Sequence, residues 1–238
     1  IHDSSLHAFM KFASFKLHPA LLKALQTKSY ADATPIQQSA IPQALAGKDV
    51  LASAQTGSGK TAAYALPILQ QLAAQTLFSP RRTLALVLVP TRELAMQVGE
   101  VFKQLGHHLP QAVQITALFG GVSINPQMMR LRGGTDVVVA TPGRLLDLID
   151  RNALHISHVE TLVLDEADRL LDMGFALEID RILALIPAKR QNLFFSATFP
   201  SAVQQLADTL LKSPVRIDVQ PTIENAADIT QRGILVDA

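Results

Sequence analysis

Short apolar runs alternate along the chain with longer amphipathic stretches. Runs such as Thr83–Val89 and Asp136–Ala140 are apolar at successive positions, not at every second one. A strand that is apolar on both faces is typical of a parallel sheet covered by helices on both sides. The runs expected to form strands are Asp49–Ala52, Thr83–Val89, Gln114–Phe119, Asp136–Ala140, Thr161–Leu164, Asn192–Ser196 and Val215–Val219.

The stretches between these runs have the apolar spacing of amphipathic helices. Further helical segments are expected within Leu17–Gln43, ahead of the first core strand. This alternation predicts a doubly wound, mainly parallel α/β sheet whose ligands bind at the carboxyl ends of the strands. The expected helices are Lys60–Ala74, Arg92–Leu105, Asn125–Leu131, Gly143–Arg151, Phe175–Ile186 and Ser201–Leu211.

Composition excludes several classes of protein. Of the 238 residues, 48% are hydrophobic and 17% charged, so we expect a sizeable buried core and no extended disorder. The absence of Cys excludes disulfides and thiolate metal sites. The longest apolar run, LALVLV, is too short to span a bilayer, and no signal peptide is visible, so we expect a cytoplasmic protein without a membrane partner. Because the net charge is only +1, nucleic-acid contacts would require local basic clusters.

Three parts of the chain are expected. Residues 1–11 are an N-terminal extension or a remnant of cloning, and residues 12–219 form the α/β domain. Residues 220–238 are polar and then end on an apolar run, which indicates a linker and the start of a second domain. The alternative is a last strand of the same sheet, because a terminal strand without a partner is unfavourable.

The stretch AQTGSGKT, which begins at Ala54, resembles the phosphate-binding loop G-x-x-x-x-G-K-[ST], with alanine in place of the first glycine. It lies between an expected strand and an expected helix, as this motif requires. Gly57 and Gly59 allow backbone N–H groups to surround phosphates, and the helix N-terminus adds partial positive charge. Lys60 would reach the β and γ phosphates, and the Thr61 hydroxyl would bind Mg²⁺. The residues expected to contact the nucleotide here are Ala54, Gln55, Thr56, Gly57, Ser58, Gly59, Lys60 and Thr61.

A chance match in a glycine-rich turn is the alternative until a second motif is considered. The stretch TLVLDEAD ends an apolar strand in acidic residues. A site for Mg²⁺ and a nucleotide requires a carboxylate at the end of a neighbouring strand, and Asp165 fits that role directly or through water. Glu166 is placed to orient or deprotonate the attacking water. Lys60, Asp165 and Glu166 are therefore the expected catalytic residues, although acids are also favoured at an ordinary helix N-terminus.

Together these motifs resemble those of DEAD-box ATP-dependent RNA helicases, with residues 165–168 spelling DEAD. The resemblance is closest to the bacterial RhlE-like members and runs from about Phe12 to the C-terminus. Alanine is usual in that family at the position of Ala54. The resemblance implies a RecA-like P-loop domain, ATP as the substrate and Mg²⁺ as the cofactor.

The stretch TPIQ, which ends at Gln37, resembles the family's Q motif. The resemblance implies that the Gln37 amide pairs with both N6 and N7 of adenine and that Phe12 stacks on the base. Considered alone, Gln37 would be interpreted as an amide on a helix surface. Ser29 departs from the family pattern, which often has glycine before the aromatic residue at the position of Tyr30.

Three further motifs, PTRELA, a Gly-Gly pair and TPGR, each follow an expected strand. The resemblance implies that they bind one RNA strand by its backbone, which gives affinity and salt dependence without base readout. Helix capping by Thr91 and Thr141, and Pro142 at a first helical position, are the alternative roles. The residues implied to contact RNA are Pro90, Thr91, Arg92, Gly120, Gly121, Thr141, Pro142, Gly143 and Arg144.

The stretch SAT, Ser196–Thr198, follows another expected strand. The resemblance implies that the hydroxyls of Ser196 and Thr198 form hydrogen bonds with Asp168 and couple the nucleotide site to the RNA site; capping is the alternative. His155 and His158 have the spacing of metal ligands but no acidic neighbours, so we expect them to be solvated. We expect the same of the pair Arg81–Arg82.

Phosphoryl transfer in this family also needs an arginine finger from a second RecA-like domain in the same chain, and no H-R-x-G-R-type motif occurs here. We therefore expect the ATP-binding domain of an RNA helicase, which binds nucleotide but hydrolyses it slowly alone. The alternatives are an ATP-gated RNA clamp and a DNA translocase of the same superfamily. The sequence leaves the oligomeric state open.

Overall fold

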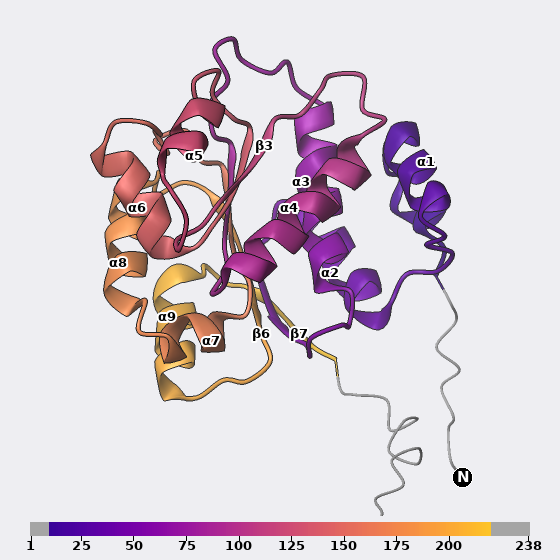
Figure 1. Ribbon diagram of the computed structural model, residues 1–238. Helices are drawn as coiled ribbons and strands as arrows, with labels where there is room; N and C mark the ends of the chain where they lie inside the picture. Colours follow the sequence, from indigo (N-terminus) through magenta and orange to yellow (C-terminus); the bar gives the residue numbers. More distant parts are fainter. Residues whose placement is uncertain (1–9, 220–238) are drawn as a thin grey trace, which may run out of the picture.

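A computed structural model describes residues 10–219, which form one sheet of seven parallel strands (Figure 1). The strand order is β3-β4-β2-β5-β6-β1-β7. This confirms the predicted doubly wound α/β class. The strands are β1 (Val50–Ser53), β2 (Ala85–Leu88), β3 (Ile115–Leu118), β4 (Val137–Ala140), β5 (Thr161–Leu164), β6 (Gln191–Ser196) and β7 (Val215–Asp218).

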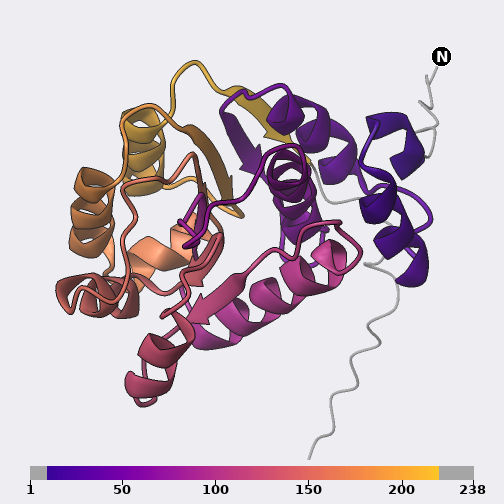
Figure 2. The same cartoon turned by 90° about the horizontal axis from the view of Figure 1, so that it is seen from above.

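Helices cover both faces of the sheet. The helices α1 to α4 lie on one side of it and α6 to α9 on the other (Figures 1 and 2). Residues of β1 alternate between the two cores: Val50 and Ala52 pack with α1 to α4, and Leu51 packs with α6 to α9. The helices are α1 (Pro19–Thr27), α2 (Pro35–Leu45), α3 (Lys60–Ala73), α4 (Arg92–Gly106), α5 (Asn125–Arg130), α6 (Pro142–Asp150), α7 (Ala167–Asp172), α8 (Ala176–Leu185) and α9 (Ser201–Leu210).

The predicted strands and helices are all present, with ends that differ by at most two residues. Two elements were not predicted: a 3-10 turn at Phe12–Phe15 and the short helix α7. Both are too short to show a clear apolar period, and α7 is followed at once by Gly174, whose φ is 84°. The proposed linker at 220–238 lies outside the described residues, so the predicted division of the chain stays a prediction.

The expectation that the pair Arg81–Arg82 is simply solvated is wrong for Arg81. Its Nη1 lies 2.9 Å from Oδ2 of Asp136, a residue with 0% exposure. The same oxygen accepts the backbone N–H of Gln114 at 2.7 Å. Burial raises the pKa of Asp136, and these two donors offset only part of that rise. Arg82 is exposed and lies over the Phe78 ring, 4.3 Å from its centroid.

The turn after α1 shows why the position of Ser29 favours glycine. Ser29 has a φ of 58°, in the left-handed region, and its N–H donates to the carbonyl of Gln26. The next residue, Tyr30, donates its N–H to the carbonyl of Leu25 and so closes the helix end at 3.0 Å. The turn therefore forms with a non-glycine residue in the left-handed region, where the Cβ of Ser29 strains the backbone.

We expect Ser29→Gly to raise the free energy of unfolding by about 1 kcal/mol, because glycine adopts this φ without a Cβ clash. The midpoint of urea denaturation measures the change. Ser29→Ala is the matched control, since it removes the hydroxyl but keeps Cβ. An equal gain in both variants would show that backbone strain is not the cause.

Candidate functional site

Ala54 occupies the first position of the phosphate-binding loop without the need for glycine. Its N–H donates to the carbonyl of Ser196 at 3.1 Å, and its side chain is 2% exposed within the core. Its φ is not positive, whereas Gly57 and Gly59 have φ values of 83° and 94°. The loop therefore has glycine where the backbone turns and alanine where the chain leaves β1.

The Gln37 amide is bound to the protein itself. Its Oε1 accepts the N–H of Thr34 at 2.9 Å, and its Nε2 donates to the carbonyl of Gly59 at 3.0 Å. Gln37 is 2% exposed, so it is not an amide on a helix surface. A Cβ on Gly59 would lie 2.5 Å from this Nε2. Pairing of Gln37 with adenine stays a prediction, and it requires the amide to share or leave these partners.

Phe12 lies in the core instead of presenting an open face. It is 4% exposed, and its ring packs against Phe15 and Tyr30 with centroid distances of 6.0 and 6.4 Å. Stacking of Phe12 on a base stays a prediction, and it would first require the ring to be uncovered. The 3-10 turn Phe12–Phe15, which contributes to this burial, has only 4 residues, too few for an apolar period to predict it.

Two oppositely charged groups meet in a buried space beside the loop. Lys60 Nζ lies 3.9 Å from Oδ1 of Asp165, and the two residues are 6% and 2% exposed. Neither atom has a hydrogen-bond partner within residues 10–219. Buried polar atoms without partners are rare in proteins. A cation and a carboxylate oxygen left free at the mouth of a phosphate-binding loop fit a nucleotide phosphate and Mg²⁺.

Sequence reasoning missed a third group at this carboxylate, the hydroxyl of Tyr64. It donates to Oδ2 of Asp165 at 2.8 Å. Burial and the Asp165 carboxylate raise the pKa of Tyr64 well above its ordinary value, while a side-chain hydrogen bond with Thr61 lowers it. Burial likewise raises the pKa of Asp165, and Lys60 and Tyr64 offset part of that rise. The sequence did hold a signal for this contact: Tyr64 is four residues after Lys60 in a predicted helix, so both side chains lie on the same helix face.

The carboxylate of Glu166 is held by a salt bridge. Its Oε2 lies 2.8 Å from Nη1 of Arg169, which is the second residue that sequence reasoning missed. The Arg169 side chain is 59% exposed and that of Glu166 is 7% exposed. Glu166 precedes α7 with a φ of 53°, so the backbone is strained at this position. The predicted catalytic role of Glu166 would require this carboxylate to leave Arg169 or to act beside it.

The predicted hydrogen bonds between Asp168 and the SAT stretch are present. The hydroxyl and the N–H of Thr198 both donate to Oδ2 of Asp168 at 2.9 Å. The Ser196 hydroxyl is bonded to Asp168 through the backbone: it accepts the N–H of Asp168 at 3.1 Å and donates to the Thr198 carbonyl at 2.7 Å. These contacts join the ends of β5 and β6, and a coupling role for them stays a prediction.

The loops with the predicted RNA contacts lie side by side because β3, β4 and β2 are neighbours in the sheet. The Thr91 hydroxyl accepts the N–H of Leu94 at 3.2 Å and caps α4, as the alternative role required. Thr141 makes no such capping bond, so capping is wrong for its side chain, whereas Pro142 does begin α6.

Two arginines on this part of the edge have distinct environments. The Arg92 guanidinium lies 5.2 Å from the centroid of the Phe119 ring, on the exposed side of α4. Arg144 is 9% exposed, and its Nη2 donates to the carbonyl of Val122 at 2.8 Å. Its Nε and Nη1 are buried without hydrogen-bond partners in the part of the chain that the structure describes. Nε lies 3.7 Å from Oδ2 of Asp147, so Nη1 is the nitrogen that has neither a hydrogen bond nor an ion pair among residues 10–219.

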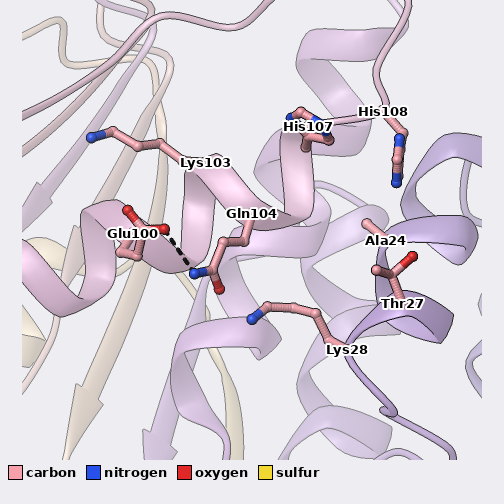
Figure 3. Close-up of a pocket in the computed structure, with 8 residues that line it drawn as sticks. All are labelled: Ala24, Thr27, Lys28, Glu100, Lys103, Gln104, His107 and His108. Atoms are coloured by element: carbon pink, nitrogen blue, oxygen red, sulfur yellow. Dashed lines mark hydrogen bonds between the residues drawn. The ribbon is translucent and has the colours of Figure 1, made fainter.

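A pocket of about 440 Å³ lies between α1 and α4 (Figure 3), and none of its lining residues is a predicted site residue. Several of its basic side chains, including Lys28 and His107, follow the last turns of these helices, where the helix dipole favours positive charge. Burial, Lys23 and His107 lower the pKa of His108. The pocket is lined by Ala24, Thr27, Lys28, Glu100, Lys103, Gln104, His107 and His108.

The described residues contain no cluster of three or more His, Cys, Asp or Glu side chains that could hold a metal ion. The spacing of His155 and His158 is therefore not part of a metal site of that kind. Across residues 10–219, no helix combines the length and the apolar character needed to cross a membrane.

A parallel sheet with a phosphate-binding loop after β1 and acidic residues after β5 defines the class of RecA-like P-loop domains. Within that class, residues 34–206 match the DEAD/DEAH box helicase family. The chain belongs to this family.

Relatives and a solved structure agree with this assignment. The chain is 43% identical over 225 residues to the ATP-dependent RNA helicase DeaD of Buchnera aphidicola, a match over 94% of this chain and 36% of that protein. It is 43% identical over 210 residues to the DEAD-box ATP-dependent RNA helicase CshA of Streptococcus pneumoniae, a match over 88% of this chain and 39% of that protein. A solved structure of a DEAD box protein from Methanococcus jannaschii superimposes with a TM-score of 0.80 at 34% identity, over 89% of this chain and 56% of that chain. The chain thus spans little more than a third of these two curated relatives.

Thr198→Val tests the bonds to Asp168. Burial alone would raise the pKa of Asp168, but the hydrogen bonds from Thr198 lower it below its ordinary value. A depressed pKa contributes stability above the unfolded pKa of about 3.9, and this stability is lost as pH falls through the folded pKa. We expect the variant to lose about 1–2 kcal/mol at pH 7 and less at pH 3, by urea denaturation.

Thr209→Val is the control for this change. The Thr209 hydroxyl donates to the backbone carbonyl of Gln205 at 2.9 Å and has no acidic partner. Its cost should therefore be independent of pH. A cost of Thr198→Val that is the same at both pH values would contradict the assigned role of the carboxylate.

Proposed function

We propose that the chain is the ATP-binding domain of an ATP-dependent RNA helicase, which couples ATP binding and hydrolysis to RNA binding and local duplex unwinding. The observation that carries the proposal is the buried pair of Lys60 Nζ and Asp165 Oδ1, both without hydrogen-bond partners among residues 10–219. The names of the relatives, DeaD and CshA, as ATP-dependent RNA helicases support it.

On the nucleotide side, the N–H groups of the loop would surround the phosphates, and Lys60 would bind the β and γ phosphates. Thr61 and Asp165 would hold Mg²⁺, partly through water. When bound, this ion would neutralise charge that develops on the phosphates during their transfer. Glu166 would orient or deprotonate the attacking water, and Gln37 would select adenine.

On the RNA side, the loops after β2, β3 and β4 would bind one strand by its phosphates and sugars. Backbone N–H groups and the Arg144 guanidinium, whose Nη1 has no hydrogen bond among residues 10–219, are suited to phosphate oxygens. Such contacts are independent of sequence and weaken with salt, and contacts to the 2′-OH would favour RNA over DNA. Asp168, Ser196 and Thr198 would couple this side to the nucleotide.

A second RecA-like domain in the same chain would complete the enzyme. We infer it because the relatives are much longer than the matched region, and because phosphoryl transfer gains about 10³–10⁵ in rate from an arginine finger. These 238 residues alone would bind ATP and hydrolyse it slowly. We further propose a cytoplasmic location, where ATP and RNA occur together.

Two other functions use the same site. An ATP-gated RNA clamp would bind RNA without displacing a strand, and a strand-displacement assay on the full-length protein separates it from a helicase. For a DNA translocase of the same superfamily, DNA would compete for the nucleic-acid site as well as RNA of the same sequence does. Measuring how well each competes with a labelled RNA for binding therefore separates an RNA helicase from a DNA translocase.

Glu166→Gln in the full-length protein should keep ATP binding and reduce hydrolysis by at least about 100-fold, because the amide cannot accept a proton from water. Release of phosphate measures hydrolysis, and calorimetry measures binding. Glu160→Gln is the matched control: Glu160 is exposed at the opposite end of β5 and should be dispensable. Unchanged hydrolysis in Glu166→Gln would exclude the assigned role.

Gln37→Ala should reduce the preference of the chain for ADP over GDP by about tenfold, because two amide hydrogen bonds to the base are lost. Isothermal titration calorimetry of both nucleotides with Mg²⁺ measures the preference. Gln38→Ala is the control, since the Gln38 amide instead donates to the carbonyl of Ala33 at 2.8 Å. A preference that survives Gln37→Ala would show that another group selects the base.

A further inference from the structure

The hydroxyl of Tyr64 is held rigidly against the Asp165 carboxylate. Tyr64 is 0% exposed, and its ring packs between Phe102 and Phe195, with centroid distances of 6.2 and 5.4 Å. Its hydroxyl donates to Oδ2 of Asp165 at 2.8 Å. Because the ring is enclosed in a close-packed core, the phenol oxygen cannot move away from Asp165 without movement of its neighbours.

The helix α3 contacts the two oxygens of this carboxylate with different groups. Lys60 and Tyr64 are four residues apart and so lie on one face of α3. Lys60 Nζ faces Oδ1 at 3.9 Å, and the Tyr64 hydroxyl bonds Oδ2. Within the described part of the chain, Oδ2 therefore has a partner and Oδ1 has none.

We propose that Tyr64 is a positioning residue that commits Oδ2 of Asp165 to the protein and leaves Oδ1 for Mg²⁺ and the nucleotide; this inference rests on the proposed function. The terminal torsion of an Asp side chain is broad, so an unrestrained carboxylate could present either oxygen. A hydrogen bond from a fixed phenol removes that freedom. Partners of this kind behind metal-binding carboxylates change metal affinity by about 10–100-fold.

A purely structural role would have a different chemical signature. A Phe side chain would fill the same space between Phe102 and Phe195 without burying a hydroxyl, and a buried hydroxyl requires a partner. If Tyr64 only fills the core, its replacement by Phe should change stability and leave the response to Mg²⁺ as it was. The Mg²⁺ response is thus the quantity that separates the two roles.

The test is the binding of ADP to the 238-residue chain by calorimetry, with a Mg²⁺ titration and with EDTA. Mg²⁺ should increase the affinity for ADP, and we expect Tyr64→Phe to raise about tenfold the Mg²⁺ concentration that gives half of this increase. A tenfold change corresponds to about 1.4 kcal/mol. Affinity in EDTA should not change. The control is Thr116→Val, which removes one buried hydroxyl bonded to Thr135 at 3.0 Å in the edge strand β3 and should leave both values unchanged.

Tyr64→Phe should also have no further effect in an Asp165→Asn background, because the residue acts through that carboxylate. An unchanged Mg²⁺ response in Tyr64→Phe overturns the proposal. So does an equal loss of affinity with Mg²⁺ and with EDTA, or a further loss in the Asp165→Asn background. If the unaltered chain binds ADP without any effect of Mg²⁺, the proposed metal site itself is wrong.

Discussion

The parallel direction of all seven strands is the constraint on which the site depends. Each strand returns through a helix on a face of the sheet, so every strand ends at the same edge. The order β3-β4-β2-β5-β6-β1 then divides that edge into two adjoining halves. The loops expected to bind RNA follow the first three strands, and the acidic residues, the SAT stretch and the phosphate-binding loop follow β5, β6 and β1. Because β5 lies beside β2, Asp165 stands where the two halves meet.

Buried charge is distributed unevenly over the second half. Asp168 has its carboxylate bonded to Thr198, and Glu166 has Arg169. Asp165 is satisfied at one oxygen only, and Lys60 Nζ opposite it has no hydrogen bond within residues 10–219. A buried charge that lacks a partner is costly, so a fold tolerates it only where another group completes the environment. The incomplete pair therefore supports the proposed position of the phosphates and Mg²⁺ independently of the motif.

The sequence predicted the sheet, its helices and the loop because these depend on local patterns: apolar runs, glycine spacing and acids at a strand end. It did not predict the contacts that join distant segments. Arg81 and Asp136 are 55 residues apart, and Tyr64 and Asp165 are 101 apart, and no period along the chain relates them. Burial of Phe12 was not predicted because it depends on a turn of four residues and on a contact with Tyr30, neither of which has an apolar period. Sequence motifs therefore predict where a loop or strand end lies, whereas tertiary packing determines which of its side chains remain available to a ligand.

The proposed recognition of adenine by Gln37 would use the same amide that contacts the loop. Its Nε2 donates to the carbonyl of Gly59, the last residue before α3, and its Oε1 accepts the N–H of Thr34. The amide nitrogen has a second hydrogen and the amide oxygen a second lone pair, so a base could bond both atoms while these bonds stay in place. The two bonds to the protein therefore fix the orientation of the amide, and a base that binds it would not have to break them.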